Sequence, residues 1–146
     1  MWLYNNKIIN NISDLEIKTF GFIYKITNKE NGKFYIGKKQ LQNKTNVKLG
    51  KKELAELPIK RGRTPSKKQV IKESNWLTYW GSCKPLLEDV KNLGEDKFKK
   101  EILKLCNSKK QLTYYEAYFQ MKEEVLFIDS YNDHILSHYY RKDFIS

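Results

Sequence analysis

Two tyrosines on adjacent predicted strands are the residues best suited to chemistry in this sequence. Tyr24 and Tyr35 belong to the stretches Gly21-Phe22-Ile23-Tyr24 and Phe34-Tyr35-Ile36-Gly37, which a short polar segment separates. A phenol has a reference pKa near 10, so a tyrosine that acts as a base needs a nearby cation to stabilise the phenolate. Two phenols held close together therefore suggest a reactive site.

A β-hairpin is the element that would position these two side chains. Phe20 to Thr27 alternates as a strand, and Lys33 to Lys38 is a return strand rich in aromatic and β-branched residues. Asn28 to Gly32 lies between them and ends in Asn-Gly, a pair favoured where backbone φ is positive. Upstream, residues 1 to 19 have enough apolar positions for a short strand or a packing arm.

Length and composition indicate one domain, residues 1–146, with a substantial core. The chain has 40% hydrophobic residues and 20 aromatic ones, but also 31% charged residues and a mean hydropathy of −0.73. No apolar run approaches the roughly 20 residues that cross a bilayer, and the N-terminus does not resemble a signal peptide. We therefore expect no membrane partner and a location in the cytoplasm.

Cysteine and histidine give weak metal signals. Cys83 and Cys106 lack any zinc-binding spacing, so two reduced, structural thiols are favoured. His134 and His138 are four residues apart and could share a helical face as metal ligands. No third ligand stands nearby, so ordinary surface histidines are the favoured interpretation.

The net charge of +11 is concentrated in residues 42–72, which carry ten basic and two acidic residues. Such a segment attracts polyanions, because each lysine that neutralises a phosphate releases counterions. Nucleic acid is the first candidate partner, and a solvated loop without a partner is the alternative. The lysines expected to bind DNA are Lys38, Lys44, Lys48, Lys51, Lys52, Lys60, Lys67, Lys68 and Lys72.

This basic segment is expected to be a loop inserted into the domain. Its glycines and prolines argue against one continuous helix, although a short helix is compatible with Lys51 to Leu57. Long insertions of this kind are uncommon unless they are functional, so we expect a substrate-facing loop that is disordered without its ligand.

Two helices and one ambiguous segment follow. Ser82 would cap a helix from Cys83 to Leu93, with Pro85 in its first turn and Gly94 at its end. Just before it, an aromatic cluster has helical spacing and favours a core position over base stacking. Lys97 to Cys106 fits either a helix or a strand by periodicity. The aromatic cluster comprises Trp76, Tyr79 and Trp80.

Glu116 lies on a second predicted helix, which begins at Ser108 with capping-box spacing and runs to about Glu124. Its position is on the edge of an apolar stripe that includes Leu112. From the residues alone, Glu116 is a surface carboxylate, a ligand, or part of a later capping box beginning at Thr113.

Phe22-Ile23-Tyr24 and Tyr35-Ile36-Gly37 resemble the paired motifs of the GIY-YIG nuclease superfamily, with Phe22 in place of the first glycine. A segment resembling the third strand at Phe98 to Leu105, the Glu116 helix and Asn132 follow in the family's order. The resemblance implies an α+β fold, with a small three-stranded, mostly antiparallel sheet flanked by helices and the basic insertion after the second strand.

The resemblance also implies a metal-dependent phosphodiester hydrolase. Glu116 would bind Mg²⁺ or Mn²⁺, Tyr24 or Tyr35 would orient or deprotonate the attacking water, and Asn132 would support the site through hydrogen bonds. A single carboxylate suits magnesium, which keeps several waters and takes substrate oxygen as a further ligand.

One family feature, an arginine on the helix after the second motif, has no obvious counterpart. Lys39, Arg61 or Arg63 would have to supply the catalytic cation, and lysine is not equivalent to arginine as a phosphate ligand. The resemblance favours a compact phage or homing-type endonuclease acting on double-stranded DNA, with specificity from a homodimer or a partner. The alternatives are a non-catalytic nucleic-acid-binding module of the same fold and a basic interaction protein without a DNA role.

Overall fold

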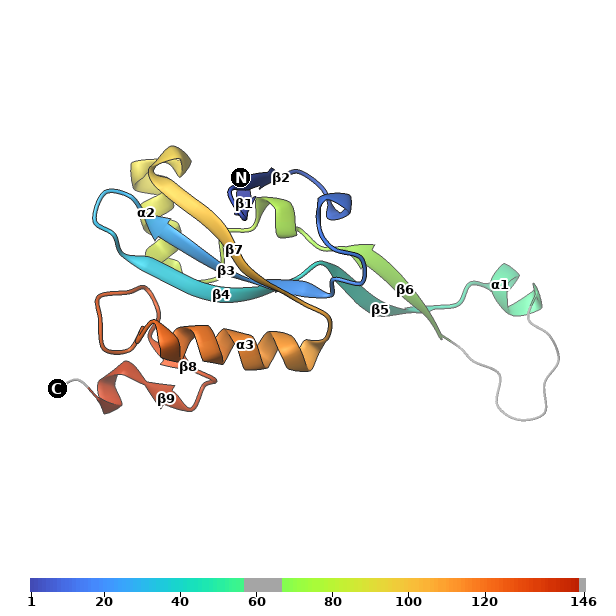
Figure 1. The fold of residues 1–146 in the computed structure, drawn as a ribbon. Helices are drawn as coiled ribbons and strands as arrows, with labels where there is room; N and C mark the ends of the chain where they lie inside the picture. Colours follow the sequence, from blue (N-terminus) through green and yellow to red (C-terminus); the bar gives the residue numbers. More distant parts are fainter. Residues whose placement is uncertain (57–66, 145–146) are drawn as a thin grey trace.

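A five-stranded sheet forms the centre of the fold in the computed structural model, which describes residues 1–56 and 67–144 (Figure 1). The strand order is β2, β1, β7, β3, β4, and all neighbours are antiparallel except β1 and β7. The expected α+β class is confirmed, but the sheet has five strands instead of three. The bounds are β1 Trp2–Tyr4, β2 Lys7–Ile9, β3 Gly21–Asn28, β4 Phe34–Gln40 and β7 Phe98–Cys106.

The two additional strands come from the N-terminal residues, where the sequence indicated only a short strand or an arm. Trp2 is fully buried, and its indole Nε1 donates a hydrogen bond of 2.7 Å to the carbonyl of Trp76. Trp76 is itself fully buried, which confirms its predicted core position. Burial of two large aromatic side chains therefore fixes the N-terminal strands against the rest of the fold.

β3 and β4 form the predicted hairpin, within two residues of the expected bounds. Tyr24 of β3 lies directly opposite Gly37 of β4. The turn is closed by a hydrogen bond of 2.8 Å from the Gly32 N–H to the Asn28 carbonyl, and Gly32 has φ +77°. Glycine adopts this left-handed conformation without a steric cost, which is why Asn-Gly is effective here.

Helices cover both faces of the sheet. α2, Lys84–Leu93, packs through Leu86 into the core cluster on one face of β3, and α3, Lys109–Lys122, packs through Leu112 into the cluster on the other. Figure 1 shows α3 running alongside the sheet beneath β3 and β4. This three-layer arrangement places the residues of α3 beside the edge strand β4.

The predicted ends of α2 are nearly correct. Pro85 occupies its first turn and Gly94 ends it with φ +98°. The expected cap at Ser82 is wrong by one residue, since Cys83 is the N-cap. In the segment 97–106, which periodicity could not assign to a helix or a strand, Phe98–Cys106 forms the strand β7, and Lys97 ends a 3₁₀ helix.

Residues 42–48 and 67–73 do not form the expected loop. They pair as a two-stranded antiparallel ribbon, β5 Gln42–Lys48 and β6 Lys67–Glu73, which projects from the sheet (Figure 1). α1, Lys51–Glu56, follows β5 and confirms the short helix expected there. The reason for the error is that the strand-forming residues at the two ends of the insertion pair with each other across a long sequence separation, which local patterns do not reveal.

The remaining elements are short. A small hairpin, β8 His134–Ile135 with β9 Tyr139–Tyr140, packs beside α3. Within the described residues, no helix has the length and apolar character needed to span a membrane. Single-turn 3₁₀ helices occur at Ile12–Asp14, Trp76–Thr78, Glu95–Lys97 and Arg141–Asp143.

Candidate active site

A cavity of about 460 Å³ lies beside the edge strand β4, between the start of α2, the middle of α3 and the segment that follows it. Tyr35 and Lys38 line it from β4, and Glu116 lines it from α3. Asn132 contributes from the C-terminal segment. The further lining residues are Ser82, Cys83, Thr113, Gln120, Tyr131, Asp133, His134, Leu136 and Ser137.

Glu116 reaches this cavity because α3 begins where the sequence predicts. Ser108 is its N-cap, and the Ser108 hydroxyl accepts a hydrogen bond of 3.2 Å from the Gln111 N–H. Leu112, Glu116 and Gln120 then recur at one-turn spacing. The later capping box at Thr113 does not form, because the helix already passes through that residue.

The carboxyl group of Glu116 is largely buried, with 18% of the side chain exposed. Burial raises its pKa, while the nearby Lys38 and His134 act in the opposite direction. The Lys38 ammonium lies 3.9 Å from the Glu116 Oε1 and also donates to the Thr113 hydroxyl at 3.3 Å. A carboxylate with so little hydration gains from any further positive charge that enters the cavity.

The two tyrosines occupy different environments. Their ring centroids are 6.1 Å apart, but Tyr35 lines the cavity while Tyr24 is 1% exposed and does not. Burial, and then the charge of Glu116, raises the pKa of Tyr35 to about 12. Burial raises the pKa of Tyr24 well above its usual value, with Tyr35 as the next cause. Both phenols are therefore protonated at neutral pH.

Asn132 is bound to the backbone of β4. Its Oδ1 accepts from the Ile36 N–H at 3.0 Å, and its Nδ2 donates to the Ile36 carbonyl at 2.9 Å. The Gln120 amide donates to the same carbonyl at 2.9 Å. Two side-chain amides thus take the place of a neighbouring strand at this edge, and they hold β4 against α3 and the C-terminal segment at the residue next to Tyr35.

Arg141 fixes the segment that carries Asn132, although no motif or spacing pattern singles it out. Its guanidinium donates to the carbonyls of Val125 and Asn132 at 2.6 Å each and to that of Ile128 at 2.7 Å. It also donates to the Ser130 hydroxyl at 3.0 Å. A planar group with five donors can gather several carbonyls from one loop, which lysine cannot do.

Replacing Arg141 with methionine is expected to destabilise the fold by about 2 kcal/mol, because several carbonyls lose a charged donor. The measurement is the free energy of unfolding in urea. The matched control is Lys142→Met, since Lys142 lies next to Arg141 in the same short helix and its ammonium lies 5.7 Å from the centroid of the Tyr140 ring, without the carbonyl contacts that Arg141 makes to other described residues. Equal effects of the two substitutions would contradict the role given to Arg141.

The structure describes one of the three predicted catalytic cations, Lys39. Lys39 does not line the cavity. Its ammonium lies 4.0 Å from the centroid of the Tyr79 ring, and burial lowers its pKa. Lys38, expected only to bind DNA, is the lysine that lines the cavity together with Glu116. Arg61 and Arg63 lie outside the described residues.

The residues at the cavity fit a cation held by one carboxylate. Among residues 1–56 and 67–144 no group of three acidic, histidine or cysteine side chains could enclose a metal ion. The premise of a shared helical face for His134 and His138 is wrong, since they belong to the β8–β9 hairpin. Glu116 offers a hard oxygen ligand in a space that also admits water and phosphate, which is the coordination that Mg²⁺ favours.

The other lysines predicted to bind DNA lie away from the cavity. Lys44, Lys48, Lys67, Lys68 and Lys72 are on the β5–β6 ribbon, and all five are exposed. Lys51 and Lys52 are exposed on α1. Lys60 lies outside the described residues.

The hairpin, the Glu116 helix and the Asn132 segment all contribute residues to this cavity. Together with the strand β7, they follow one another along the chain in the order typical of a GIY-YIG nuclease domain. A family model described as "Putative endonuclease segE, GIY-YIG domain" matches residues 2–143, so the chain belongs to the GIY-YIG family. Membership indicates nuclease activity in general terms. No curated protein and no solved structure matches the chain.

Proposed function

We propose that this protein is a metal-dependent endonuclease that hydrolyses phosphodiester bonds in double-stranded DNA, as one nuclease domain of the phage or homing type. The observation that carries the proposal is the cavity at the edge of β4, where the Glu116 carboxylate and the Tyr35 phenol meet in a chain of the GIY-YIG family. Lys38 adds a positive charge at the same place.

Each side chain has a role that follows from its environment. Tyr35, with its pKa of about 12, keeps its proton and can donate a hydrogen bond that orients water or a phosphate oxygen. Lys38 can bind phosphate as a point charge. Tyr24 is buried against Tyr35 and supports the position of that ring.

Glu116 would hold Mg²⁺ or Mn²⁺. When bound, the metal would polarise the phosphoryl oxygen and stabilise the leaving alkoxide. A cation near Glu116 would also oppose the carboxylate charge that raises the pKa of Tyr35, so a Tyr35 phenolate is easier to form in the loaded site.

Nicking of supercoiled plasmid tests the proposal. The purified protein should convert supercoiled plasmid to the nicked or linear form with Mg²⁺ or Mn²⁺ and not with EDTA. Salt-sensitive binding of duplex DNA without cleavage under any of these conditions would refute the enzyme. That result would favour the non-catalytic binding module of the same fold.

Metal binding can be measured separately from cleavage. Metal at 100 times its dissociation constant should stabilise the wild type by about 2.7 kcal/mol. The Glu116→Gln variant should gain little, because the carboxylate ligand is gone. The measurement is the thermal unfolding midpoint with and without Mn²⁺. An equal gain in both proteins would contradict Glu116 as the ligand.

The stability of Glu116→Gln relative to wild type is also expected to depend on pH in the absence of metal. A carboxyl group whose pKa is raised by folding destabilises the protein above that pKa, and the penalty disappears as the pH falls below the unfolded value, near 4.3. Glu116→Gln should therefore unfold at a higher temperature than wild type at pH 7, and the difference should shrink toward pH 4. Thermal melts across this range check the direction.

A further inference from the structure

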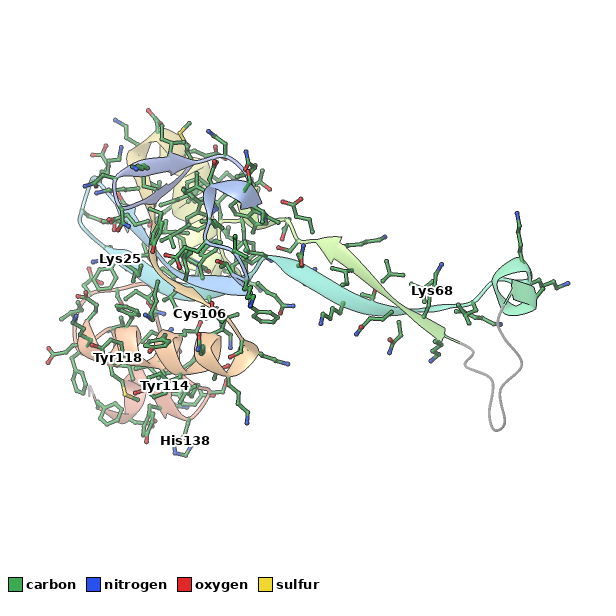
Figure 2. The ribbon with its side chains drawn as sticks, turned by 45° about the vertical axis from the view of Figure 1, so that its right-hand side comes forward. Lys25, Lys68, Cys106, Tyr114, Tyr118 and His138 are labelled. Carbon is green, nitrogen blue, oxygen red and sulfur yellow. The ribbon has the colours of Figure 1, made fainter. Side chains whose placement is uncertain are left out.

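We infer that the β5–β6 ribbon is a sequence-reading element that lies in the major groove of duplex DNA, to one side of the bond that is cut. The inference rests on the proposed function for its choice of substrate. The ribbon pairs seven residues from each strand, from Gln42 opposite Glu73 to Lys48 opposite Lys67. Figure 2 shows it projecting from the sheet with side chains extending from both sides, Lys68 among them.

The ribbon has no core of its own. Val70 is half-buried, and every other residue of β5 and β6 is exposed. Even Val47 and Ile71 are 41% and 56% exposed. Since an isolated two-stranded hairpin is at best marginally stable in water, these side chains contribute little to the fold. Their arrangement is better explained by a partner that covers them.

The charge of the ribbon identifies that partner as a polyanion. The paired residues include five lysines and one acid, Glu73, which lies at the root and accepts a hydrogen bond of 2.8 Å from the Trp76 indole. Lys48 and Lys67 lie directly opposite each other. Like charges in this position are unfavourable unless an anion lies over them. A phosphate backbone supplies that anion.

One face of the ribbon combines these charges with groups that can read bases. Asn46 lies directly opposite Gln69, and residues opposite or two apart on a strand share a face. Lys44 lies on one side of this amide pair, and Lys48 with Lys67 lies on the other. Asparagine and glutamine can bind an adenine edge with two hydrogen bonds in the major groove. The central amides would therefore contact bases while the flanking lysines contact phosphates.

The opposite face has no such amide pair. Thr45 lies opposite Val70 at its centre, and Lys72 opposite Asn43 and Lys68 opposite Val47 lie on either side. β-branched side chains support the strand conformation but offer few base contacts. Both faces carry lysines, so the hydrogen-bonding capacity of the amide pair is what favours the Asn46 face for the groove.

The dimensions of the ribbon suit a major groove. Two strands about 4.8 Å apart fit a groove about 12 Å wide, and seven residues span about 24 Å, the length of about seven base pairs. A-form RNA has a major groove too narrow for such an element. The structure therefore favours B-form DNA over duplex RNA.

The position of the ribbon relative to the cavity determines how far from the cut bond the ribbon would contact the bases. β5 continues the direction of β4 (Figure 1), and the Ser74 N–H donates to the buried Leu41 carbonyl at 2.8 Å where the two elements join. β5 begins seven residues after Tyr35 and ends at Lys48. At about 3.3 Å per residue, a duplex lying along both elements would be read about 7 to 13 base pairs from the cut, on one side only.

Selection of bound DNA from a randomised duplex library, in EDTA to prevent cleavage, tests the inference. The wild type should enrich a short base pattern and prefer it to random duplex by about tenfold or more. Asn46→Ala/Gln69→Ala should lose this preference while binding random duplex as before. Lys48→Ala/Lys67→Ala should weaken binding to all duplexes and reduce the slope of log affinity against log salt by about two.

The matched control is Asn43→Ala/Thr45→Ala, which removes two polar side chains from the other face of the same strand. It should retain the wild-type preference. No enrichment by the wild type, full preference in Asn46→Ala/Gln69→Ala, or equal loss in the control would overturn the inference. So would stronger binding to duplex RNA than to duplex DNA.

Cleavage assays keep this inference separate from the proposed function. Ribbon-dependent enrichment in a protein that never cleaves DNA with Mg²⁺ or Mn²⁺ would refute the endonuclease and support the reading element. Cleavage without any ribbon-dependent preference would support the endonuclease and overturn the reading element. In a protein that does both, the preferred bases should lie about 7 to 13 base pairs from the cut.

Discussion

Glu116→Gln is expected to reduce plasmid cleavage by about 10³-fold or more, because several kcal/mol of transition-state stabilisation depend on the metal that this carboxylate would hold. Glutamine has nearly the same shape and can keep a hydrogen bond, so the cavity should retain its form. The measurement is the single-turnover rate of nicking with Mg²⁺ at saturating protein.

Binding of DNA by Glu116→Gln should be preserved or slightly strengthened. The carboxylate lies 3.9 Å from the Lys38 ammonium, and its loss leaves that ammonium available to phosphate. Affinity for an uncut duplex in EDTA checks this part of the prediction. Weaker binding and slower cleavage by the same factor would indicate a binding role in place of a metal ligand.

Glu88→Gln is the matched control. Glu88 is an exposed carboxylate on α2 and does not line the cavity. The substitution changes the net charge by the same amount, so any effect of overall charge on DNA affinity appears in both variants. If Glu116→Gln cleaved plasmid as fast as Glu88→Gln, the result would contradict a role for Glu116 in cleavage.

The hairpin and the Glu116 helix were predictable because their signals are local. Asn31-Gly32 specifies a turn, the flanking residues alternate, and Ser108 caps a helix within four residues of its own position. In each case the residues that decide the structure are neighbours in the sequence. The GIY-YIG resemblance then indicated that segment 98–105 is a strand, whereas periodicity alone did not distinguish a strand from a helix.

The hydrogen bonds that hold the walls of the cavity in place were not predictable, since they join residues that are distant in the sequence. Asn132 binds Ile36 across 96 positions, and Gln120 binds it across 84. Arg141 acts on backbone carbonyls, which carry no sequence signature. A glutamine one turn after Glu116 was the available signal, because a polar residue on the same helical face is unusual beside an apolar stripe.

The ribbon was missed for a related reason. Its strands are rich in lysine, asparagine and glutamine, so composition indicated a loop, and their pairing spans an insertion of considerable length. Strand propensity reflects a pleated surface that is half-buried, and this ribbon has almost no buried side. A ribbon selected for contacts with a partner does not show the alternation of a ribbon packed on a core.

Gly37→Ala is expected to have the second large effect, because Gly37 lies between the two tyrosines. A Cβ at this position would be 2.5 Å from the Tyr24 hydroxyl oxygen, 2.7 Å from Tyr24 Cζ and 2.9 Å from Tyr35 Cε1. Real contacts do not approach so closely, so one or both rings must move. In a buried site, overpacking of this kind costs about 1 to 3 kcal/mol of stability.

The effect on cleavage should exceed the effect on folding. A displacement of about 1 Å in a group that orients a reactant can reduce the rate about 10²-fold. The variant is measured at a temperature where urea titration shows it fully folded, so that the rate reports the position of Tyr35. Wild-type cleavage by folded Gly37→Ala would mean that neither ring position matters to the reaction.

Gly32→Ala provides the control in the same hairpin. Gly32 has φ +77° and no atom within 4 Å of an added Cβ, so alanine there costs about 1 kcal/mol through backbone strain alone. It should lower stability and leave cleavage unchanged. Tyr24→Phe removes the atom nearest to the new Cβ, so Gly37→Ala should be less damaging to stability in that background. A purely additive result would show that the two residues do not collide, and the tyrosine pair would then not be what requires glycine in this motif.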